Sequence, residues 1–197
     1  MENWNWMAWY QAGGPVLLTL LGCSVIGLAL AMERGWFYLR HRVDYPALFQ
    51  KLQTPEAMIP ENGEKGAGIF RAVLKGKTAS RRAAALELAL ESEKLRREKY
   101  LPLLATLAVV APFLGLLGTI GGIMKTFREM GASGLSGPQA VAAGVGEALV
   151  STAAGLLVAI LAVTFFNLYK SYNLRYLAKA ANLARRLALE LEEGERS

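Results

Sequence analysis

Three apolar stretches, each of membrane-span length and without Lys or Arg between its ends, constrain the fold of this chain more than any other feature. They run from Pro15 to Met32, from Leu101 to Met124 and from Ala140 to Tyr169. A helix needs about 20 mainly apolar residues to cross the hydrocarbon layer of a bilayer. Because 53% of the residues are also hydrophobic, the sequence predicts an all-α integral membrane protein with three spans.

The basic residues are distributed unevenly among the segments outside these spans. Residues 1–14 contain none, 34–100 contain fourteen, 125–139 contain two, and the tail from 170 contains six. Lys and Arg accumulate on the cytoplasmic side, so the N-terminus and the 125–139 turn are predicted outside, and the other two segments inside. Basic residues beside spans normally contact anionic lipid headgroups, so a net charge of +6 does not indicate nucleic-acid binding.

The spans divide the chain into four segments. Residues 1–33 hold an outer N-terminus and the first span, 34–100 form a cytoplasmic region, 101–170 form a hairpin of the second and third spans, and 171–197 form a cytoplasmic C-terminal helix. The C-terminal helix is predicted to continue the third span without a break. Both long helices are therefore expected to project into the cytoplasm.

The cytoplasmic region changes character along its length. Prolines and glycines break 44–76 into short helices and turns, and its fold is not readable. From Thr78 the chain favours a helix, with Glu93 and Arg97 placed as an i,i+4 ion pair. We expect this helix to run on into the second span, although Pro102 interrupts its backbone hydrogen bonding, as membrane helices tolerate.

No residue pattern indicates an enzyme or a cofactor site. Cys23, the only cysteine, lies within the first span, and His41, the only histidine, lies just inside the membrane, so neither belongs to a metal-binding cluster. Residues 76–78 are similar to the end of a phosphate-binding loop, but Arg71 occupies the position that requires the first glycine. We predict no catalysis and no cofactor.

The second and third spans each carry small and polar residues on one side and large apolar residues on the other, with residues placed at about 100° per step. On the second span the small side holds Ala105, Ala108, Ala111, Pro112, Gly115, Gly118, Thr119, Gly122 and Thr126. On the third span it holds Gly144, Glu147, Ala148, Ser151, Thr152, Gly155, Ala159 and Ala162. Such faces let helices approach closely. The predicted close-packing positions are Gly115, Gly118, Gly122 and Gly155.

Packing alone does not explain Glu147, which lies about two turns inside the third span. A carboxylate at the bilayer centre costs on the order of 2.5 to 3.5 kcal/mol, so it implies water or a partner, unless Glu147 reaches the outer headgroups. Thr119 and Thr152 lie at similar distances from a turn centred near Leu135, roughly 18 Å inward. We predict that these hydroxyls and Ser151, on the same face, line a shared polar interior.

The motifs PFLGLLGTIGGIM, from residue 112, and GVGEALVSTAAGLLVAI, from residue 144, resemble the TolQ/ExbB/MotA family of proton-channel proteins. The three-span layout is similar to TolQ and ExbB rather than to the four-span MotA. The resemblance implies a pentamer in the bacterial inner membrane, with Thr119 and Thr152 as pore threonines and Glu147 as the pore glutamate. With Ser151, these residues form the expected ion pathway. It also implies an ExbD- or TolR-like single-span partner inside the ring, which brings the titrating aspartate. Leu161 departs from the family pattern, which has a proline that bends the third helix.

The function implied by the resemblance is that of a motor subunit driven by the proton-motive force. Such a motor couples proton flow to mechanical work on the outer membrane or envelope, with a TonB- or TolA-like protein as a further partner. Protons are the expected coupling ion, and nothing in the sequence excludes sodium. The sequence does not indicate whether nutrient import, envelope maintenance or motility is energised. Two alternatives stay open, a self-contained oligomeric transporter of an ion or small solute, and a membrane scaffold that conducts nothing.

Overall fold

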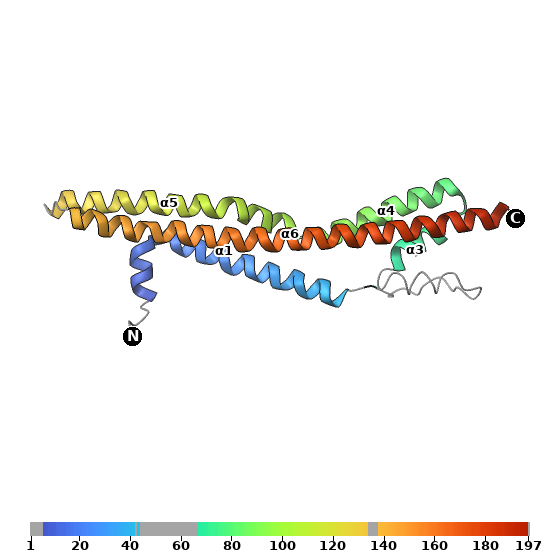
Figure 1. Ribbon diagram of the computed structural model, residues 1–197, viewed down its shortest axis with the longest axis horizontal. Helices are drawn as coiled ribbons and strands as arrows, with labels where there is room; N and C mark the ends of the chain where they lie inside the picture. Colours follow the sequence, from blue (N-terminus) through green and yellow to red (C-terminus); the bar gives the residue numbers. More distant parts are fainter. Residues whose placement is uncertain (1–5, 42, 44–66, 134–137, 197) are drawn as a thin grey trace. The chain divides into compact units, whose positions relative to one another are not determined.

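The computed structural model describes residues 6–41, 43, 67–133 and 138–196, which form helices and short connections (Figure 1). The helices are α1 (Trp6–Arg40), α3 (Ala67–Leu74), α4 (Ala79–Glu98), α5 (Leu101–Ser133) and α6 (Pro138–Arg196). Over these described ranges the chain contains no strand. The predicted all-α fold is confirmed for this part of the protein.

Three of the helices are long and apolar enough to cross a membrane. The candidate spans are Pro15–Arg40 in α1, Leu101–Ala132 in α5 and Val141–Gly194 in α6. Each contains almost all of one stretch that the sequence predicts, and each is longer because the helix continues past the first charged residues. The three predicted membrane-spanning helices are therefore confirmed by length and composition.

The junction between α4 and α5 differs from the sequence-based expectation. A continuous helix was expected there, and this is wrong, because Lys99 and Tyr100 form a turn between two separate helices. Pro102 provides the physical reason, since its nitrogen carries no proton for the carbonyl four residues earlier and its ring clashes with that carbonyl. By contrast, α6 is one unbroken helix of 59 residues, which agrees with the expected continuation of the third helix and includes Leu161.

The Gly-Lys-Thr run before α4 is a turn and a helix cap. The side-chain oxygen of Thr78 accepts a hydrogen bond from the backbone N–H three residues later at 3.4 Å, as an N-cap residue does. The carbonyl of Gly76 accepts from Nε of Arg82 at 3.0 Å, and a Cβ at Gly76 would lie 2.9 Å from the Arg82 backbone. A glycine is therefore required by this close approach. Residues 44–66, within the segment whose fold the sequence leaves unread, lie outside the described residues.

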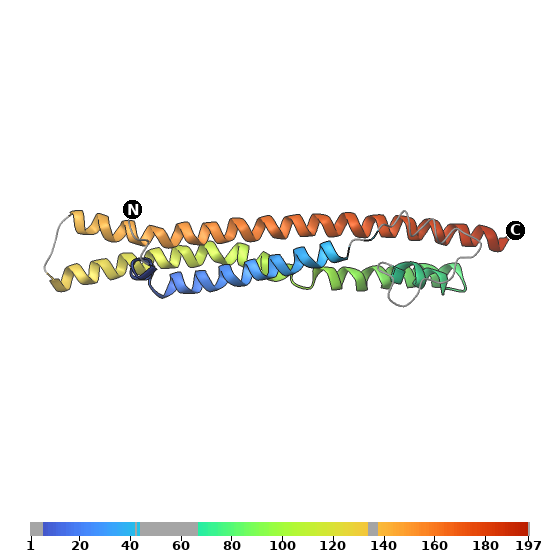
Figure 2. The same cartoon turned by 90° about the horizontal axis from the view of Figure 1, so that it is seen from below.

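The helices pack as two compact units. Unit 1 comprises Met1–Glu33 and Tyr100–Asn167, which include α5 and parts of α1 and α6. One small cluster of buried side chains in it joins Leu20 of α1, Ala111 of α5 and Ala159 of α6. Figures 1 and 2 show the later turns of this part of α1 alongside the α5–α6 pair, whereas its first turns, in dark blue, point away from the pair. Most of the buried side chains described in unit 1 are small, as at Ala111, Ala148 and Ala159, so unit 1 depends on close backbone packing between α5 and α6.

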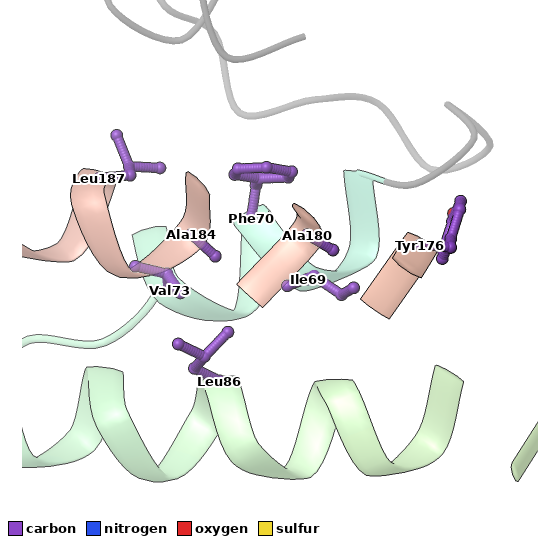
Figure 3. Close-up of a cluster of buried hydrophobic side chains, with 8 residues drawn as sticks. All are labelled: Ile69, Phe70, Val73, Leu86, Tyr176, Ala180, Ala184 and Leu187. Carbon is purple, nitrogen blue, oxygen red and sulfur yellow. The ribbon is translucent and has the colours of Figure 1, made fainter. Parts of the chain in front are cut away.

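Unit 2 comprises Arg34–Lys99 and Leu168–Ser197 and has a larger apolar core. The core side chains come from α3, α4 and α6 and are shown in Figure 3. They are Ile69, Phe70, Val73, Leu86, Tyr176, Ala180, Ala184 and Leu187. Small residues on α6 face large ones on α3, so the helices interlock in the manner of a protein interior.

Polar groups join three helices within unit 2. The hydroxyl of Tyr38, in α1, donates to the backbone carbonyl of Arg97 at 3.0 Å and accepts from the amide of Asn173, in α6, at 3.1 Å. Nη1 of Arg34 donates to the same carbonyl at 3.4 Å. This carbonyl belongs to the last turn of α4, where carbonyls lack partners within their own helix. Tyr38 and Arg34 therefore cap α4 from a neighbouring helix.

The guanidinium of Arg97 is fully buried in the same network. Its Nε donates to the Glu93 carboxylate at 2.9 Å, which confirms the predicted i,i+4 ion pair. Its Cζ lies 3.2 Å from the ring centroid of Tyr176, so a cation–π contact adds to the pair. Nη1 of Arg97 and the amide oxygen of Asn173 are buried without a hydrogen-bond partner among the described residues.

Candidate functional site

The backbones of α5 and α6 come very close together within unit 1. A Cβ added to Gly155 would lie 2.6 Å from the carbonyl oxygen of Ala111 and 2.9 Å from Cα of Gly115. A Cβ added to Gly115 would lie 2.8 Å from the carbonyl oxygen of Ser151. Because these neighbours are backbone atoms that cannot rotate away, both positions require glycine.

This line of close contact, here called the seam, continues along both helices. The seam consists of Ala111, Gly115, Gly118, Gly122 and Thr126 of α5, and of Gly144, Ala148, Ser151, Gly155 and Ala159 of α6. The structure places all four predicted close-packing glycines in it. Large apolar side chains such as Phe113, Leu117 and Leu157 lie on the exposed sides of the two helices. Seam spacings of three and four residues are those of small-residue packing faces in membrane helices.

Thr119 and Thr152 meet on one flank of the seam. Their hydroxyl oxygens are hydrogen-bonded to each other. Each hydroxyl also lies 3.3 Å from the carbonyl oxygen of Gly115, and that of Thr119 lies 3.2 Å from the carbonyl oxygen of Ala148. Both side chains are half-buried in the single chain. The structure thus brings together two hydroxyls that are 33 residues apart in the sequence.

Backbone carbonyls complete this arrangement, and no sequence pattern could have identified them. Two hydroxyl protons have several acceptors within reach, namely the partner hydroxyl and the carbonyls of Gly115 and Ala148. A hydroxyl is both a donor and an acceptor, so each keeps lone pairs for water or for a protonated acid. The pair can therefore accept a proton on one side and pass one on by rotating a hydroxyl. The turn from which the threonine depth was estimated, at 134–137, lies outside the described residues.

Ser151 lies in the seam itself rather than beside the two threonines. Its side chain is fully buried, and its Oγ has no hydrogen-bond partner in the part of unit 1 that the structure describes. A Cβ added to Gly118 would lie 2.6 Å from Cβ of Ser151 and 3.1 Å from Val16 of α1. The structure therefore packs the side chain of Ser151 directly against Gly118 of α5.

Glu147 lies on the opposite flank of α6 from the threonines. It precedes Thr152 by five residues, and five steps of about 100° place the two side chains about 140° apart around the helix. Glu147 precedes Ala154 by seven residues, a spacing that places both side chains on the same face of α6. Ala154 packs against the cluster that contains Leu20 of α1. Its side chain is exposed and makes no hydrogen bond or ion pair with any described residue. The structure does not bring Glu147 together with the two hydroxyls.

The threonine pair has no carboxylate near it along the sequence of either helix. Neither 101–128 nor 148–189 contains Asp or Glu. Among the described residues, no group of three His, Cys, Asp or Glu side chains is placed to hold a metal ion. A hydroxyl relays a proton but does not bind one stably at neutral pH, so the pair needs an acid from elsewhere to hold the proton.

Comparison with known proteins gives a consistent result. A family model described as the MotA/TolQ/ExbB proton channel family matches residues 54–182. The biopolymer transport protein ExbB-like 3 of Synechocystis is 35% identical over 187 residues, which cover 85% of this chain and 86% of the relative. Tol-Pal system protein TolQ of Pseudomonas aeruginosa is 30% identical, over 79% of this chain and 77% of its own length. The biopolymer transport protein ExbB of Xanthomonas campestris is 45% identical over 95 residues, which cover 48% of this chain and 38% of the relative.

Proposed function

This chain belongs to the MotA/TolQ/ExbB proton channel family, and from that membership we propose that it forms the ring of a motor driven by the proton-motive force. Its three apolar helices and its family make it a membrane-embedded, multi-pass protein of a proton-channel motor. The ring is proposed to contain five copies in the bacterial inner membrane, with the N-terminus outside and the C-terminus in the cytoplasm. The charge distribution supports this orientation, since 34–100 and the tail from 170 carry most of the basic residues.

The threonine pair is the observation that carries the proposal. Thr119 and Thr152 lie on the flank of the seam that α1 does not occupy, so α5 and α6 can present both hydroxyls to the inside of a ring. The pair can relay a proton but has no acid of its own. We assign the acid to a single-span, ExbD- or TolR-like partner that occupies the ring. Each proton that crosses the potential releases about 2.3 kcal/mol per 100 mV, which can drive the partner from one subunit's threonine pair to the next.

Glu147 is proposed as a separate proton-binding residue on the proton path. It is exposed on the other flank of α6 and lies about five residues, roughly 7.5 Å, nearer the start of α6 than Thr152. In the proposed orientation this end of α6 faces the outside. Glu147 would therefore collect protons from the outer side before they reach the hydroxyls. The work done by the partner would pass to a TonB- or TolA-like protein in the envelope.

Two valine substitutions test the role of the hydroxyls. Thr119→Val and Thr152→Val keep the side-chain shape and remove the polar group. Thr106→Val and Thr164→Val are matched controls, because the hydroxyls of Thr106 and Thr164 bond, among the described residues, only a carbonyl of their own helix, at 2.9 Å and 2.7 Å. Loss of a hydrogen bond to a charged group costs about 1.5 to 3 kcal/mol, so the first two variants should slow proton flux roughly tenfold or more. Flux is measured in vesicles that hold this chain and its co-purified partner.

The same measurement separates the proposal from its alternatives. If the test variants and the controls conduct equally, the threonine pair is not part of the proton path. If the test variants lose assembly as well as flux, the small faces serve as a scaffold. If the chain alone moves an ion or solute without a partner, it is a self-contained transporter. Replacing protons by sodium as the only driving gradient identifies the coupling ion, which we propose to be the proton.

A further inference from the structure

Lys125 in α5 and Glu147 in α6 carry opposite charges within the candidate membrane spans. Nζ of Lys125 lies 3.8 Å from the carboxylate of Glu129, one turn further along α5, and these two side chains are 63% and 66% exposed. An ion pair between groups this exposed contributes little stability. Glu147 is exposed and forms no ion pair with any described residue. Ionisable residues inside a membrane normally pair with one another, so Lys125 is a candidate partner of Glu147 if both lie on the same flank of the seam.

Contacts across the seam fix the register of α5 against α6. A Cβ added to Gly122 would lie 2.8 Å from Cβ of Ala148. A Cβ added to Gly144 would lie 2.8 Å from Cβ of Thr126. Residue numbers therefore rise along α5 as they fall along α6, so the two helices are antiparallel, and each contact marks one height that both helices share.

This register places Lys125 and Glu147 at similar heights. Lys125 follows Gly122 by three residues, so it lies about 4.5 Å beyond the contact between Gly122 and Ala148, towards the end of α5. Glu147 precedes Ala148 by one residue, so it lies about 1.5 Å beyond the same contact in the same direction. The two residues therefore differ in height by about 3 Å.

The threonine pair shows how residues beside the seam are assigned to a flank. Thr119 follows the seam residue Gly115 by four positions, and Thr152 follows the seam residue Ala148 by four. At about 100° per step, each threonine is turned about 40° from the seam in the same rotational sense. Their hydroxyls are hydrogen-bonded to each other. Equal rotation in one sense on these antiparallel helices therefore brings two side chains to one flank.

Lys125 and Glu147 share the opposite flank by the same rule. Lys125 follows Gly122 by three positions, and Glu147 follows Gly144 by three, so each is turned about 60° from the seam in the opposite rotational sense. Their side chains are longer than those of the threonines, which already reach each other on the first flank. The ammonium and the carboxylate can therefore meet across the seam.

Few other charges compete for these two groups within unit 1. No charged residue occurs in 6–32, which includes the part of α1 that packs against this flank, or in 101–124, 141–146 and 148–169. Arg128 lies three residues beyond Lys125 and is turned about 60° further from the seam. Glu129 is therefore the main rival for the ammonium of Lys125.

We propose that Lys125 pairs with Glu147 across the seam and moves to Glu129 when Glu147 takes up a proton. This inference rests on the proposed function, in which Glu147 binds protons from the outer side. A proton and the ammonium compete for the same carboxylate oxygens, so the incoming proton forms an O–H bond on Glu147 and releases Lys125. When Lys125 returns, that bond breaks and the proton passes to water or a hydroxyl on the pathway. Lys125 is thus a positioning residue that promotes release of the proton.

Thiol crosslinking tests the geometry without reference to proton flux. In a Cys23→Ser background, Lys125→Cys is combined with Glu147→Cys and treated in native membranes with a bis-maleimide that spans about 8 to 10 Å, the usual distance between packed helix axes. We expect a link between the two peptides within a band of monomer size. Met124→Cys with Glu147→Cys is the matched control and should not link, because Met124 is turned about 100° further from the seam than Lys125.

The threonine flank supplies a positive control for the crosslink. Thr119→Cys with Thr152→Cys should link, because these side chains are in contact. If this pair links and the Lys125–Glu147 cysteine pair does not, the proposed ion pair is overturned. If neither pair links, the register of the seam is wrong, and the ion pair falls with it.

Proton flux in vesicles that hold the chain and its co-purified partner tests the role of the charge. Lys125→Met should slow flux roughly fivefold, as for the loss of a partly exposed ion pair, with little change in Tm. Lys125→Arg keeps the charge and should keep the flux. Arg128→Met removes the same charge from a position that faces away from Glu147, and Glu129→Gln removes only the rival carboxylate, so both should conduct as the wild type does.

The outcomes separate this inference from the proposed function. A crosslink together with slow flux in Lys125→Met and normal flux in Lys125→Arg supports it. Normal flux in Lys125→Met, or equal loss in Glu129→Gln, overturns the role of Lys125 and leaves the proposed motor intact. A wild-type complex that conducts no protons overturns the proposed function and the role of Lys125 with it, whereas the ion pair itself is decided by the crosslink.

Discussion

Substitution of Gly155 by alanine should separate α5 from α6 and weaken unit 1. The added Cβ would lie 2.6 Å from the carbonyl oxygen of Ala111, whereas ordinary contact begins at 3.4 Å, so the helices must move apart by about 0.8 Å. A second clash, at 2.9 Å, involves Cα of Gly115, so no side chain can rotate to relieve it. Overpacking of this kind costs about 1 to 3 kcal/mol. The same movement would lengthen the hydroxyl contact between Thr119 and Thr152.

The assay compares Gly155→Ala with Gly146→Ala in the same helix. Nothing lies within 4 Å of a Cβ added to Gly146, so the control substitution causes no clash. It only raises the helix propensity at this position, which stabilises the helix by about 1 kcal/mol. Thermal unfolding of the purified protein in detergent should show a lower Tm for Gly155→Ala and an unchanged or higher Tm for Gly146→Ala. Proton flux should fall only for Gly155→Ala. A Gly155→Ala protein that melts at or above the wild-type temperature would refute the close backbone contact.

Two further substitutions test unit 2 and the seam. Tyr38→Phe removes the hydroxyl that bridges the Arg97 carbonyl and Asn173, so it should lower stability by about 1 to 3 kcal/mol, measured by thermal unfolding, and an unchanged Tm would contradict the bridging role. Ser151→Ala removes a buried hydroxyl that has no partner among the described residues, so stability should stay the same or rise, and flux should persist. If Ser151→Ala abolishes flux while the protein stays folded, Ser151 belongs to the ion pathway after all.

Periodicity in the sequence was enough to predict the helices and their faces. In a membrane helix, residue size at a spacing of three and four determines which side can approach another helix, so the sequence alone assigns Gly115 and Gly155 to the packing side. The similar depth estimated for Thr119 and Thr152 follows from the constant rise per residue. The structure adds that the two hydroxyls are in contact.

Other features depend on contacts that no local pattern encodes. The angle between Glu147 and Thr152 could be calculated from their spacing, but only the position of α1 shows which flank of α6 is covered. The burial of Ser151 likewise depends on its close packing against Gly118 of the other helix. The break between α4 and α5 was underestimated because Pro102 was expected only to interrupt a continuous helix.

The capping network of unit 2 was missed for the same reason. Tyr38 and Asn173 are 135 residues apart, and neither belongs to a motif. The sequence signals were Arg34, a basic residue next to the first span where contact with lipid headgroups is expected, and Arg97, which is expected only to pair with Glu93. Both are buried instead and bind protein groups.

The most direct test of the proposed motor is to purify the complex from native membranes and to measure its mass. The complex is then placed in vesicles, and its proton flux is measured with and without a membrane potential. We predict several copies of this chain around a single-span partner with an acidic residue in its span, and flux that requires both that partner and the Thr119–Thr152 pair. A complex that contains this chain alone and conducts protons at the full rate would contradict the proposal.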